Sequence, residues 1–397
     1  MLITGIGQLV TNASGERGDL GLIAKAAVVT DGSSIVWVGE EEALPPEYRD
    51  QAATDAEGRA VLPGFVDAHT HVVFAGDRSE EFARRLRGES YEQILSAGGG
   101  IHSTVAATRA ASFEALTATA AARMDRMLQM GTTTVEVKSG YGLDTASEVR
   151  LLEVAASAAD ASGVSVVPTF LGAHVPDRGV DRTAYVDLVV EEMLPAVAGR
   201  ATFCDVFVDR GAFTVDDARR ILMAAAGRGM GARIHGEQLS HTGAARLGAE
   251  LGAASVDHLD HATADDAAAL AAAGVVATLL PAASFSMRAP QAPGRMLWDS
   301  GATVAIATDC NPGTANVESM PLVIALACLE MGLTPEEAVW AATRGGARSL
   351  RLTDRGTISV GAIADLVVLD APSYVHLPYR PGTDLVHRVM KSGVWVR

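Results

Sequence analysis

Short apolar runs alternate with longer alanine-rich stretches between residues 63 and 355. The runs have the length and composition of strands that are buried on both faces. Eight of them can be recognised, at LPGFVDAH, TTTVEVK, VSVVPTFL, TFCDVFV, ARIHG, ASVDHL, VVATLLP and TVAIATD. Intervening stretches such as SEVRLLEVAASAADASG have the spacing of helices. Strands that alternate with helices predict an α/β fold, and eight repeats favour a (β/α)8 TIM-like barrel, with a doubly wound sheet as the alternative.

The two ends of the chain have a different pattern. Residues 1–62 contain β-rich runs, two of which flank an Asp31-Gly32 turn of the kind that joins strands in a hairpin. The last segment, residues 356–397, has the same character in GTISVGAIADLVVLD and HRVMKSGVWVR. We therefore expect residues 1–62 and 356–397 to form one small β-sandwich domain beside a catalytic barrel of residues 63–355.

Polar side chains stand at or just after the carboxyl ends of several predicted strands. In chain order they are His69 and His71, Lys138, His174, His235, His258 and Asp309. In a barrel all these strand ends meet at one face, where active sites are built from strand ends and the loops that follow them. The pattern predicts that residues far apart in the sequence converge there.

His69 and His71 are separated by one residue, so on a strand both imidazoles point to the same face, about 7 Å apart along the chain. Taken alone the pair is weak evidence, because polar residues at a strand end are common. Together with His235 and Asp309 it makes a nitrogen and oxygen ligand set suited to zinc or iron. A bound ion lowers the pKa of a coordinated water toward about 7 and polarises a carbonyl, which favours hydrolysis.

Three of the strand-end residues have candidate roles beside the ion. Asp309 is a base near the proposed metal and can carry the proton from water to the leaving group, although Asp in TDCNPG is also a common helix N-cap. His258 can stabilise an oxyanion or the attacking water. Lys138 could be carboxylated and bridge two ions, but we favour a simple rim lysine and one metal.

Further candidates lie on the predicted loops. Arg78 offers a planar fork that matches a carboxylate, and its alternative role is an ion pair with Glu80 or Glu81. Tyr141 stands between two glycines on a flexible loop at the rim, where it can cover a ligand. The NPGTAN segment from Asn311 offers donors near the metal or a plain turn.

Composition narrows the function classes. A net charge of −16 and a pI near 5.0 argue against a nucleic-acid partner. The longest uncharged stretch, from Ala267, is broken by Gly274 and Pro281, so we expect no membrane span. Three cysteines without paired spacing, and no signal-peptide pattern at the first residues, lead us to expect a cytoplasmic location.

Several longer motifs are specific enough to indicate a family. LPGFVDAHTH, RIHG, VDHL, ATD and the tail GTISVGAIADLVVLD resemble the amidohydrolase superfamily. More selective are GGGIHSTVAATR, GTTTVEVKSGYGLD, TFLGAHVP and ATDCNPGT, which are similar over nearly the whole chain to the imidazolonepropionase family. This resemblance implies hydrolysis of the cyclic amide of 4-imidazolone-5-propanoate to N-formimidoyl-L-glutamate in histidine degradation, and a homodimer.

The same resemblance implies roles for individual residues. One zinc or iron ion (Zn²⁺ or Fe²⁺/Fe³⁺) would be bound by His69, His71, His235 and Asp309. Substrate contacts would fall on Arg78, Tyr141 and His174, and product contacts on Asn311, Gly313 and Thr314. His258 would be the second-sphere catalytic histidine.

One departure affects the expected chemistry. Where many family members read His-Ala-Asp-Glu, this chain has His235, Gly236, Glu237 and Gln238, so a carboxylate often given a catalytic role becomes an amide. Gln238 can hydrogen-bond the substrate ring but is a poor base, which moves the proton transfer toward Asp309 and His258. Glu237 points the other way on an extended segment and is the weaker substitute.

Two other functions remain as alternatives. A deaminase of a purine or pyrimidine ring from the same superfamily would share the metal site, but Arg78 and KSGYGLD suit a carboxylated imidazolone better than a neutral base. A non-catalytic scaffold would be expected only if the ligand set were incomplete.

Overall fold

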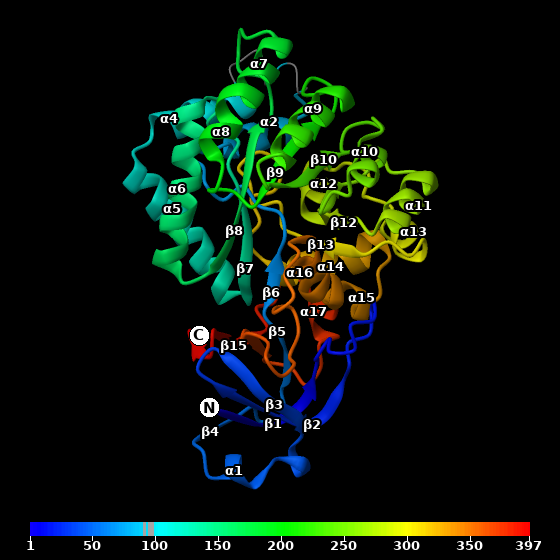
Figure 1. Cartoon of the computed structure of the whole chain (residues 1–397). Coiled ribbons are helices and arrows are strands. Elements are labelled where there is room, and N and C mark those ends of the chain that lie inside the picture. Colours follow the sequence, from blue (N-terminus) through cyan, green and yellow to red (C-terminus); the bar gives the residue numbers. More distant parts are fainter. Residues whose placement is uncertain (90–92, 94–98) are drawn as a thin grey trace.

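The computed structural model describes residues 1–89, 93 and 99–397. Its strands form two sheets of eight, one from the middle of the chain and one from both ends. Figure 1 shows the middle of the chain in the upper part of the molecule and the sheet of the two ends below it. No helix among the described residues is long and apolar enough to cross a membrane.

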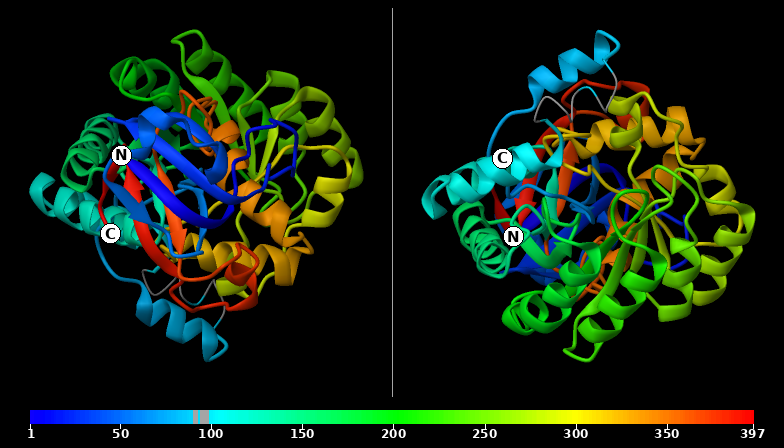
Figure 2. Two further views of the ribbon diagram at one scale, coloured as in Figure 1. Left: turned by 90° about the horizontal axis from the view of Figure 1, so that it is seen from below. Right: turned by 90° about the horizontal axis from the view of Figure 1, so that it is seen from above.

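The middle sheet is a barrel of parallel strands in strict chain order. Its strands are β6 (Phe65–Asp67), β7 (Thr132–Lys138), β8 (Ser165–Ala173), β9 (Phe203–Val208), β10 (Gly231–Gly236), β11 (Ser255–His258), β12 (Val276–Leu279) and β13 (Val304–Ile306). Seen from above in Figure 2, helices surround these strands, as a (β/α)8 barrel requires. The predicted fold class is confirmed, and the doubly wound alternative is wrong.

The helices of the described residues vary in length. They are α1 (Pro46–Arg49), α2 (Ser79–Leu86), α4 (Ile101–Ala110), α5 (Phe113–Gln129), α6 (Thr145–Ser162), α7 (Arg182–Leu188), α8 (Leu194–Val197), α9 (Val215–Ala226), α10 (Ala244–Leu251), α11 (Ala264–Ala273), α12 (Pro281–Met287), α13 (Gly294–Asp299), α14 (Met320–Met331), α15 (Pro335–Trp340), α16 (Gly346–Ser349) and α17 (His376–Tyr379). Their ends follow local chemistry. For example, Asp144 caps α6 by accepting the Ser147 N–H, and Gly163 ends it with a φ of 74°.

The chain ends form the second sheet, in the order β16-β15-β14-β5-β1-β2-β3, with β4 beside β1. Its strands are β1 (Leu2–Leu9), β2 (Ile23–Asp31), β3 (Ser34–Glu40), β4 (Ala53–Asp55), β5 (Ala60–Pro63), β14 (Leu366–Leu369), β15 (Val386–Lys391) and β16 (Val394–Trp395). Ile35 of β3 and Met390 of β15 belong to one buried cluster although their strands lie far apart in the order. The sheet therefore folds over on itself, which produces the sandwich from one continuous sheet.

The barrel interior is unusually polar for a protein core. Its fully buried charged side chains are Asp67, Glu136, Lys138, Asp205, Arg233 and Asp257. Because a buried charge is costly unless it is paired, five of these side chains form connected ion pairs, whereas Asp67 has no ion-pair partner among the described residues and accepts hydrogen bonds from the N–H and hydroxyl of Thr308. The network lies behind the candidate site.

Candidate active site at the carboxyl ends of the barrel strands

The carboxyl ends of the barrel strands enclose a cavity of about 360 Å³. Nearly all the predicted site residues line it, namely His71, Arg78, Tyr141, His174, His235, Gln238, His258, Asp309, Asn311, Gly313 and Thr314. His69 is fully buried and adjoins this group through Asp309. The structure thus brings the strand-end histidines and Asp309 together with the predicted loop residues, whereas Lys138 does not line the cavity.

The predicted metal ligands gather where the barrel closes. β6 and β13 are joined through a single parallel bridge between Thr70 and Cys310, just beyond the two strands. Here the Asp309 N–H donates to the carbonyl of His69, and the His71 N–H donates to the carbonyl of Cys310, both at 3.0 Å. Both strands end earlier than expected, before His69 and Asp309, because regular pairing stops at this seam.

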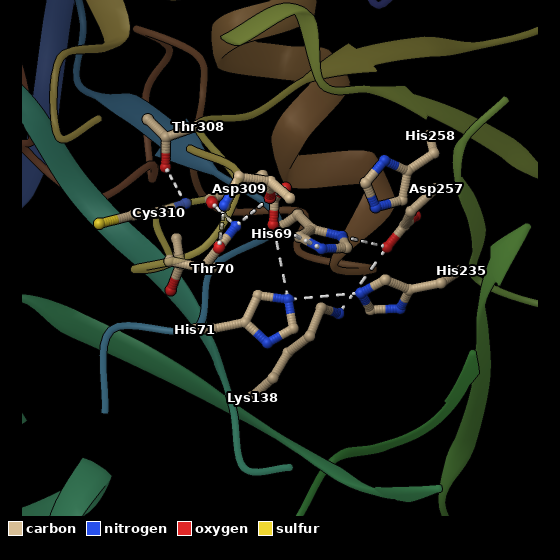
Figure 3. Close-up of polar contacts among 12 residues, drawn as sticks. His69, Thr70, His71, Lys138, His235, Asp257, His258, Thr308, Asp309 and Cys310 are labelled. Carbon is tan, nitrogen blue, oxygen red and sulfur yellow. Dashed lines mark hydrogen bonds and ion pairs between the residues drawn. The ribbon is translucent and has the colours of Figure 1, made fainter. Parts of the chain in front are cut away.

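Four ligand atoms converge at this seam (Figure 3). Oδ1 of Asp309 lies 3.5 Å from Nε2 of both His69 and His71, and Nε2 of His71 lies 3.3 Å from Nε2 of His235. Zinc bonds of about 2.0–2.2 Å to nitrogen and oxygen place the atoms of a tetrahedral shell roughly 3.3–3.5 Å apart. Nε2 of His69 is buried without a hydrogen-bond partner among the described residues. The residues present therefore fit a small divalent ion.

The electrostatics agree with ligation. Burial lowers the pKa of His69 and of His71 well below the usual histidine value, so both imidazoles are neutral, the form that binds a metal. Burial raises the pKa of Asp309 well above the usual range, while hydrogen bonds from Asn311 and Thr314 oppose that rise. A cation beside Asp309 would favour its carboxylate form.

Asp309 is not a helix N-cap. The next helix, α14, begins at Met320 and is capped by Ser319, so the alternative role of Asp309 is wrong. Asp309 instead has a φ of 51°, and His258 has a φ of 76°. Non-glycine residues with such backbone angles cost free energy and are concentrated at functional sites.

His258 ends β11 beside the other imidazoles. Its ring centroid lies 5.5 Å from that of His69 and 5.4 Å from that of His235. Its Nδ1 is buried and unpartnered within the described chain, and the Asp260 carboxylate lies 3.9 Å away. His258 is thus close enough to act on a molecule held at the metal position.

Lys138 is not a rim residue, contrary to expectation. It is fully buried, and its ammonium group lies among the carboxylates of Glu136, Asp205 and Asp257. Burial alone would lower the pKa of Lys138, but Asp205 and Glu136 raise it above the ordinary value. An ammonium group held in this way is not the neutral amine that carboxylation requires.

Arg78 combines both roles that were considered for it. Its Nε and Nη2 donate to Oε2 of Glu81 at 3.0 and 2.9 Å, and its side chain still lines the cavity. A Cβ at Gly313 would lie 2.3 Å from Nη1 of Arg78, so only glycine allows the guanidinium to lie where it does. One edge of the fork is therefore fixed by Glu81, and the rest faces the site.

Tyr141 does not lie on a flexible loop. The carboxylate of Glu148 accepts the N–H groups of Gly140, Gly142 and Leu143 at 2.8–2.9 Å, which fixes the loop. Tyr141 itself is buried. Gly142 permits the close approach to Glu148, and Gly140 adopts a φ of 103°, so neither glycine indicates mobility.

His174 is oriented by the same loop. Its Nδ1 contacts the carbonyl of Gly140 at 3.0 Å, and burial lowers its pKa to about 3, so the imidazole is neutral. A neutral ring that donates from Nδ1 to a carbonyl has an acceptor at Nε2. The ring also stacks on that of His71, with centroids 5.2 Å apart.

Glu237 and Gln238 have separate tasks. The Glu237 carboxylate is buried and accepts N–H groups of Thr242, Gly243 and Ala245 at the start of α10. Gln238 lines the cavity. Asp209 fixes the next residues, since it accepts the Leu239 N–H at 2.7 Å. Of the two, only Gln238 can reach a bound molecule.

The Asn311 side chain organises a turn. It donates to the Asp309 carbonyl and to Thr314 Oγ1, and its Oδ1 accepts the N–H groups of Gly313 and Thr314. Thr314 Oγ1 in turn lies 3.3 Å from Oδ2 of Asp309. This turn supports Asp309, and contact between the Asn311 side chain and a ligand would replace bonds that it already makes.

Several supporting residues had not been singled out from the sequence, among them Glu148, Asp205, Asp209 and Asp257. Asp257 contacts Nδ1 of His69 at 2.7 Å, and Asp205 contacts Nδ1 of His235 at 3.0 Å. A usable signal was present, because both carboxylates interrupt apolar strands, and a charge inside a buried strand needs a buried partner.

Comparison with known proteins agrees with this arrangement. Residues 60–396 match the model of the amidohydrolase family. An imidazolonepropionase from Salinispora arenicola is 52% identical over 99% of this chain and 98% of its own length. One from Streptomyces coelicolor is 52% identical with the same coverage.

A solved structure shares the fold at lower identity. An adenosine deaminase from Xanthomonas campestris with bound zinc has a TM-score of 0.75 and 20% identity, covering 99% of this chain and 92% of the other. Identity this low shows the fold alone and does not support the deaminase alternative. The imidazolonepropionases, with about half of their residues identical, are much nearer in sequence. The chain belongs to the amidohydrolase family and, within it, to the imidazolonepropionase family.

Proposed function

We propose that the chain hydrolyses the cyclic amide of 4-imidazolone-5-propanoate and releases N-formimidoyl-L-glutamate. The observation that carries the proposal is one cavity that joins two overlapping groups of potential metal ligands, His69–His71–Asp309 and His69–His235–His258, to the guanidinium of Arg78. A carboxylated ring could then be bound by its propionate while its amide lies at the metal position. Membership of the imidazolonepropionase family is in accord with this reaction.

We propose one metal ion per chain, zinc or iron, bound by His69, His71, His235 and Asp309. When bound, such an ion would activate a water and polarise the ring carbonyl. Both metals accept this ligand set, and availability can decide between them. Lys138 lies among the nearby carboxylates, which favours one ion over two.

The substrate half of the cavity would bind and orient the ring. The exposed edge of the Arg78 guanidinium binds the propionate in a charge-assisted contact. Tyr141 and His174 lie 5.5 Å apart by ring centroid and contact the ring, with His174 Nε2 accepting a ring N–H. The backbone of Gly313 and the hydroxyl of Thr314 contact the product.

Proton transfer falls to Asp309 and His258. Asp309 accepts a proton from the attacking water as oxygen bonds to the ring carbonyl carbon, and returns it to the ring nitrogen when the carbon–nitrogen bond breaks. His258 stabilises the negative charge that develops on oxygen. Gln238 hydrogen-bonds the substrate ring. It does not act as the base, because a carboxamide does not accept protons at neutral pH.

The cellular setting is also part of the proposal. We propose a cytoplasmic homodimer that acts on a small molecule, with no nucleic-acid or membrane partner, and with residues 63–355 as the catalytic barrel. Size-exclusion chromatography with light scattering tests the dimer.

The deciding experiment generates the unstable imidazolone in place with urocanase. Loss of its ultraviolet absorbance and formation of formimidoylglutamate should both exceed the spontaneous rate when metal-loaded protein is added. Rates equal to the spontaneous rate would refute the proposal. Parallel assays for ammonia release from guanine, adenine and cytosine should be negative, and a positive result would revive the deaminase alternative.

A further inference from the structure

One buried ammonium group lies behind the ligand cluster. Nζ of Lys138 is 2.7 Å from Oε1 of Glu136, 2.7 Å from Oδ2 of Asp205 and 3.7 Å from Oδ2 of Asp257. All four side chains are completely buried. Figure 3 draws Lys138 and Asp257 beside His235, with the other labelled imidazoles around them.

Two of these carboxylates touch a predicted ligand directly. Asp257 Oδ2 lies 2.7 Å from Nδ1 of His69. Asp205 holds His235 at two atoms, because its Oδ1 accepts the backbone N–H at 3.2 Å and its Oδ2 lies 3.0 Å from Nδ1. In each case a contact at Nδ1 leaves Nε2 to face the metal position.

Glu136 holds the remaining segment. Its Oε2 accepts the N–H of Thr70 at 3.2 Å, and its carbonyl accepts the Thr70 hydroxyl at 2.6 Å. Thr70 lies between His69 and His71, so Glu136 fixes the backbone that carries both. The three carboxylates around Lys138 thus contact the His69 ring, the His235 ring and the backbone between His69 and His71.

Lys138 is the cation that allows these carboxylates to lie together. Arg233 pairs with Asp257 at 3.1 Å and lies 3.7 Å from Glu136. Among the described residues, however, Lys138 is the one lysine or arginine within 4 Å of Asp205. Without the ammonium group, Asp205 and Glu136 would repel each other in a medium that screens charge poorly.

We infer that Lys138 is a positioning residue for the metal centre, which sets metal affinity by holding the three carboxylates that orient the histidine ligands. This inference rests on the metal site of the proposed function. The inference predicts that the ammonium group of Lys138 strengthens metal binding, whereas a nearby positive charge that only repelled the ion would weaken it. Removing a positive charge near a cation site would by itself strengthen cation binding, whereas loss of ligand orientation weakens it.

The sign of the change is therefore the test. Lys138→Met keeps the length of the side chain and removes the charge. Lys391→Met is the matched control, because Lys391 is also a buried lysine, paired with Asp365 at 2.8 Å in the small sheet. For each purified protein, zinc affinity is measured by competition with a chromophoric chelator, and the visible absorption of the Co²⁺-substituted form reports ligand geometry.

Lys138→Met should bind zinc at least tenfold more weakly, with an altered Co²⁺ spectrum, because partners behind the ligands typically change metal affinity by about 10- to 100-fold. Lys391→Met should match the wild type in both measurements, whatever its loss of thermal stability. Unchanged or tighter zinc binding by Lys138→Met would overturn the inference.

A second variant covers the case in which Lys138→Met does not fold. Asp205→Asn removes the negative charge and replaces one carboxylate oxygen by an amide group. It therefore disturbs the contacts of Asp205 with Lys138 and His235 and should also weaken zinc binding at least tenfold. Wild-type affinity and spectrum from Asp205→Asn would refute the inference. If the wild-type protein itself bound no zinc or cobalt, the proposed metal site would fail instead, so the two failures are distinguishable.

Discussion

The two halves of the cavity are held in place by different means. The metal half carries its histidines at or just beyond strand ends, and the buried carboxylates of Asp257 and Asp205 contact the ring nitrogens of His69 and His235 from behind. The substrate half comes from loops and helix starts, where Arg78 and Tyr141 depend on the local partners Glu81 and Glu148. Ligand geometry must be met to within a fraction of an ångström, so it is built on the rigid sheet. Substrate contacts tolerate placement on fixed loops.

If this contrast is right, changes in the metal half lower kcat. The largest effect is expected for Asp309→Asn, which removes both a charged ligand and the proton carrier, so kcat should fall by about a thousandfold or more. Steady-state kinetics and metal content measured on the same sample check this. A variant that kept a tenth of the wild-type activity would contradict the proposed roles of Asp309.

Changes in the substrate half should act mainly on KM. Arg78→Ala removes a charge-assisted contact worth about 1.5–3 kcal/mol, so KM should rise roughly 10- to 100-fold with a much smaller change in kcat. Arg87→Ala is the control, because Arg87 follows the same helix, α2, but is exposed and paired with Glu80. An equal effect from both variants would remove Arg78 from the substrate site.

Glu148→Gln tests whether the Tyr141 loop must be fixed. The amide cannot accept all three backbone N–H groups, which leaves a buried donor unpaired at a cost of about 1–3 kcal/mol, and kcat/KM should fall about tenfold. Glu153→Gln on the exposed side of α6 should leave kcat/KM unchanged. Full activity of Glu148→Gln, with the thermal unfolding temperature also unchanged, would mean that the loop does not need this carboxylate.

The smallest effects separate Glu237 from Gln238. Glu237→Gln weakens the start of α10 and should cost about 0.5–2 kcal/mol of folding free energy, with kcat/KM within about threefold of wild type. Gln238→Ala should leave stability nearly unchanged and lower kcat/KM about tenfold, as expected for loss of one neutral hydrogen bond to the substrate. The reverse pattern would make Glu237 the substrate contact.

The same contrast explains what the sequence could predict. The barrel and the metal half follow from one rule, that parallel strands present their carboxyl ends on one face, so His69, His235 and Asp309 were placed without knowledge of any contact. Strand periodicity also gives β7 with its observed bounds, because its buried residues are continuous.

The other features of the site could not be predicted, because they depend on contacts between distant segments that local sequence patterns do not indicate. Glycines on both sides of Tyr141 indicated a flexible loop, yet Glu148, seven residues later, fixes it through three N–H groups. Arg85 lies four residues after Glu81, the spacing of a helical ion pair, but it donates to the carbonyl of Gly313, because Glu81 pairs with Arg78. Lys138 was assigned to the rim because its burial depends on three carboxylates from three strands.

The most direct test of the central claim is a metal titration of the whole protein. Protein stripped of metal with a chelator should have no activity above the spontaneous loss of 4-imidazolone-5-propanoate. Stepwise addition of zinc or of iron under anaerobic conditions should restore activity in proportion, with saturation at one ion per chain. Full activity in the stripped protein, or saturation only at two ions per chain, would contradict a single-metal hydrolase built on His69, His71, His235 and Asp309.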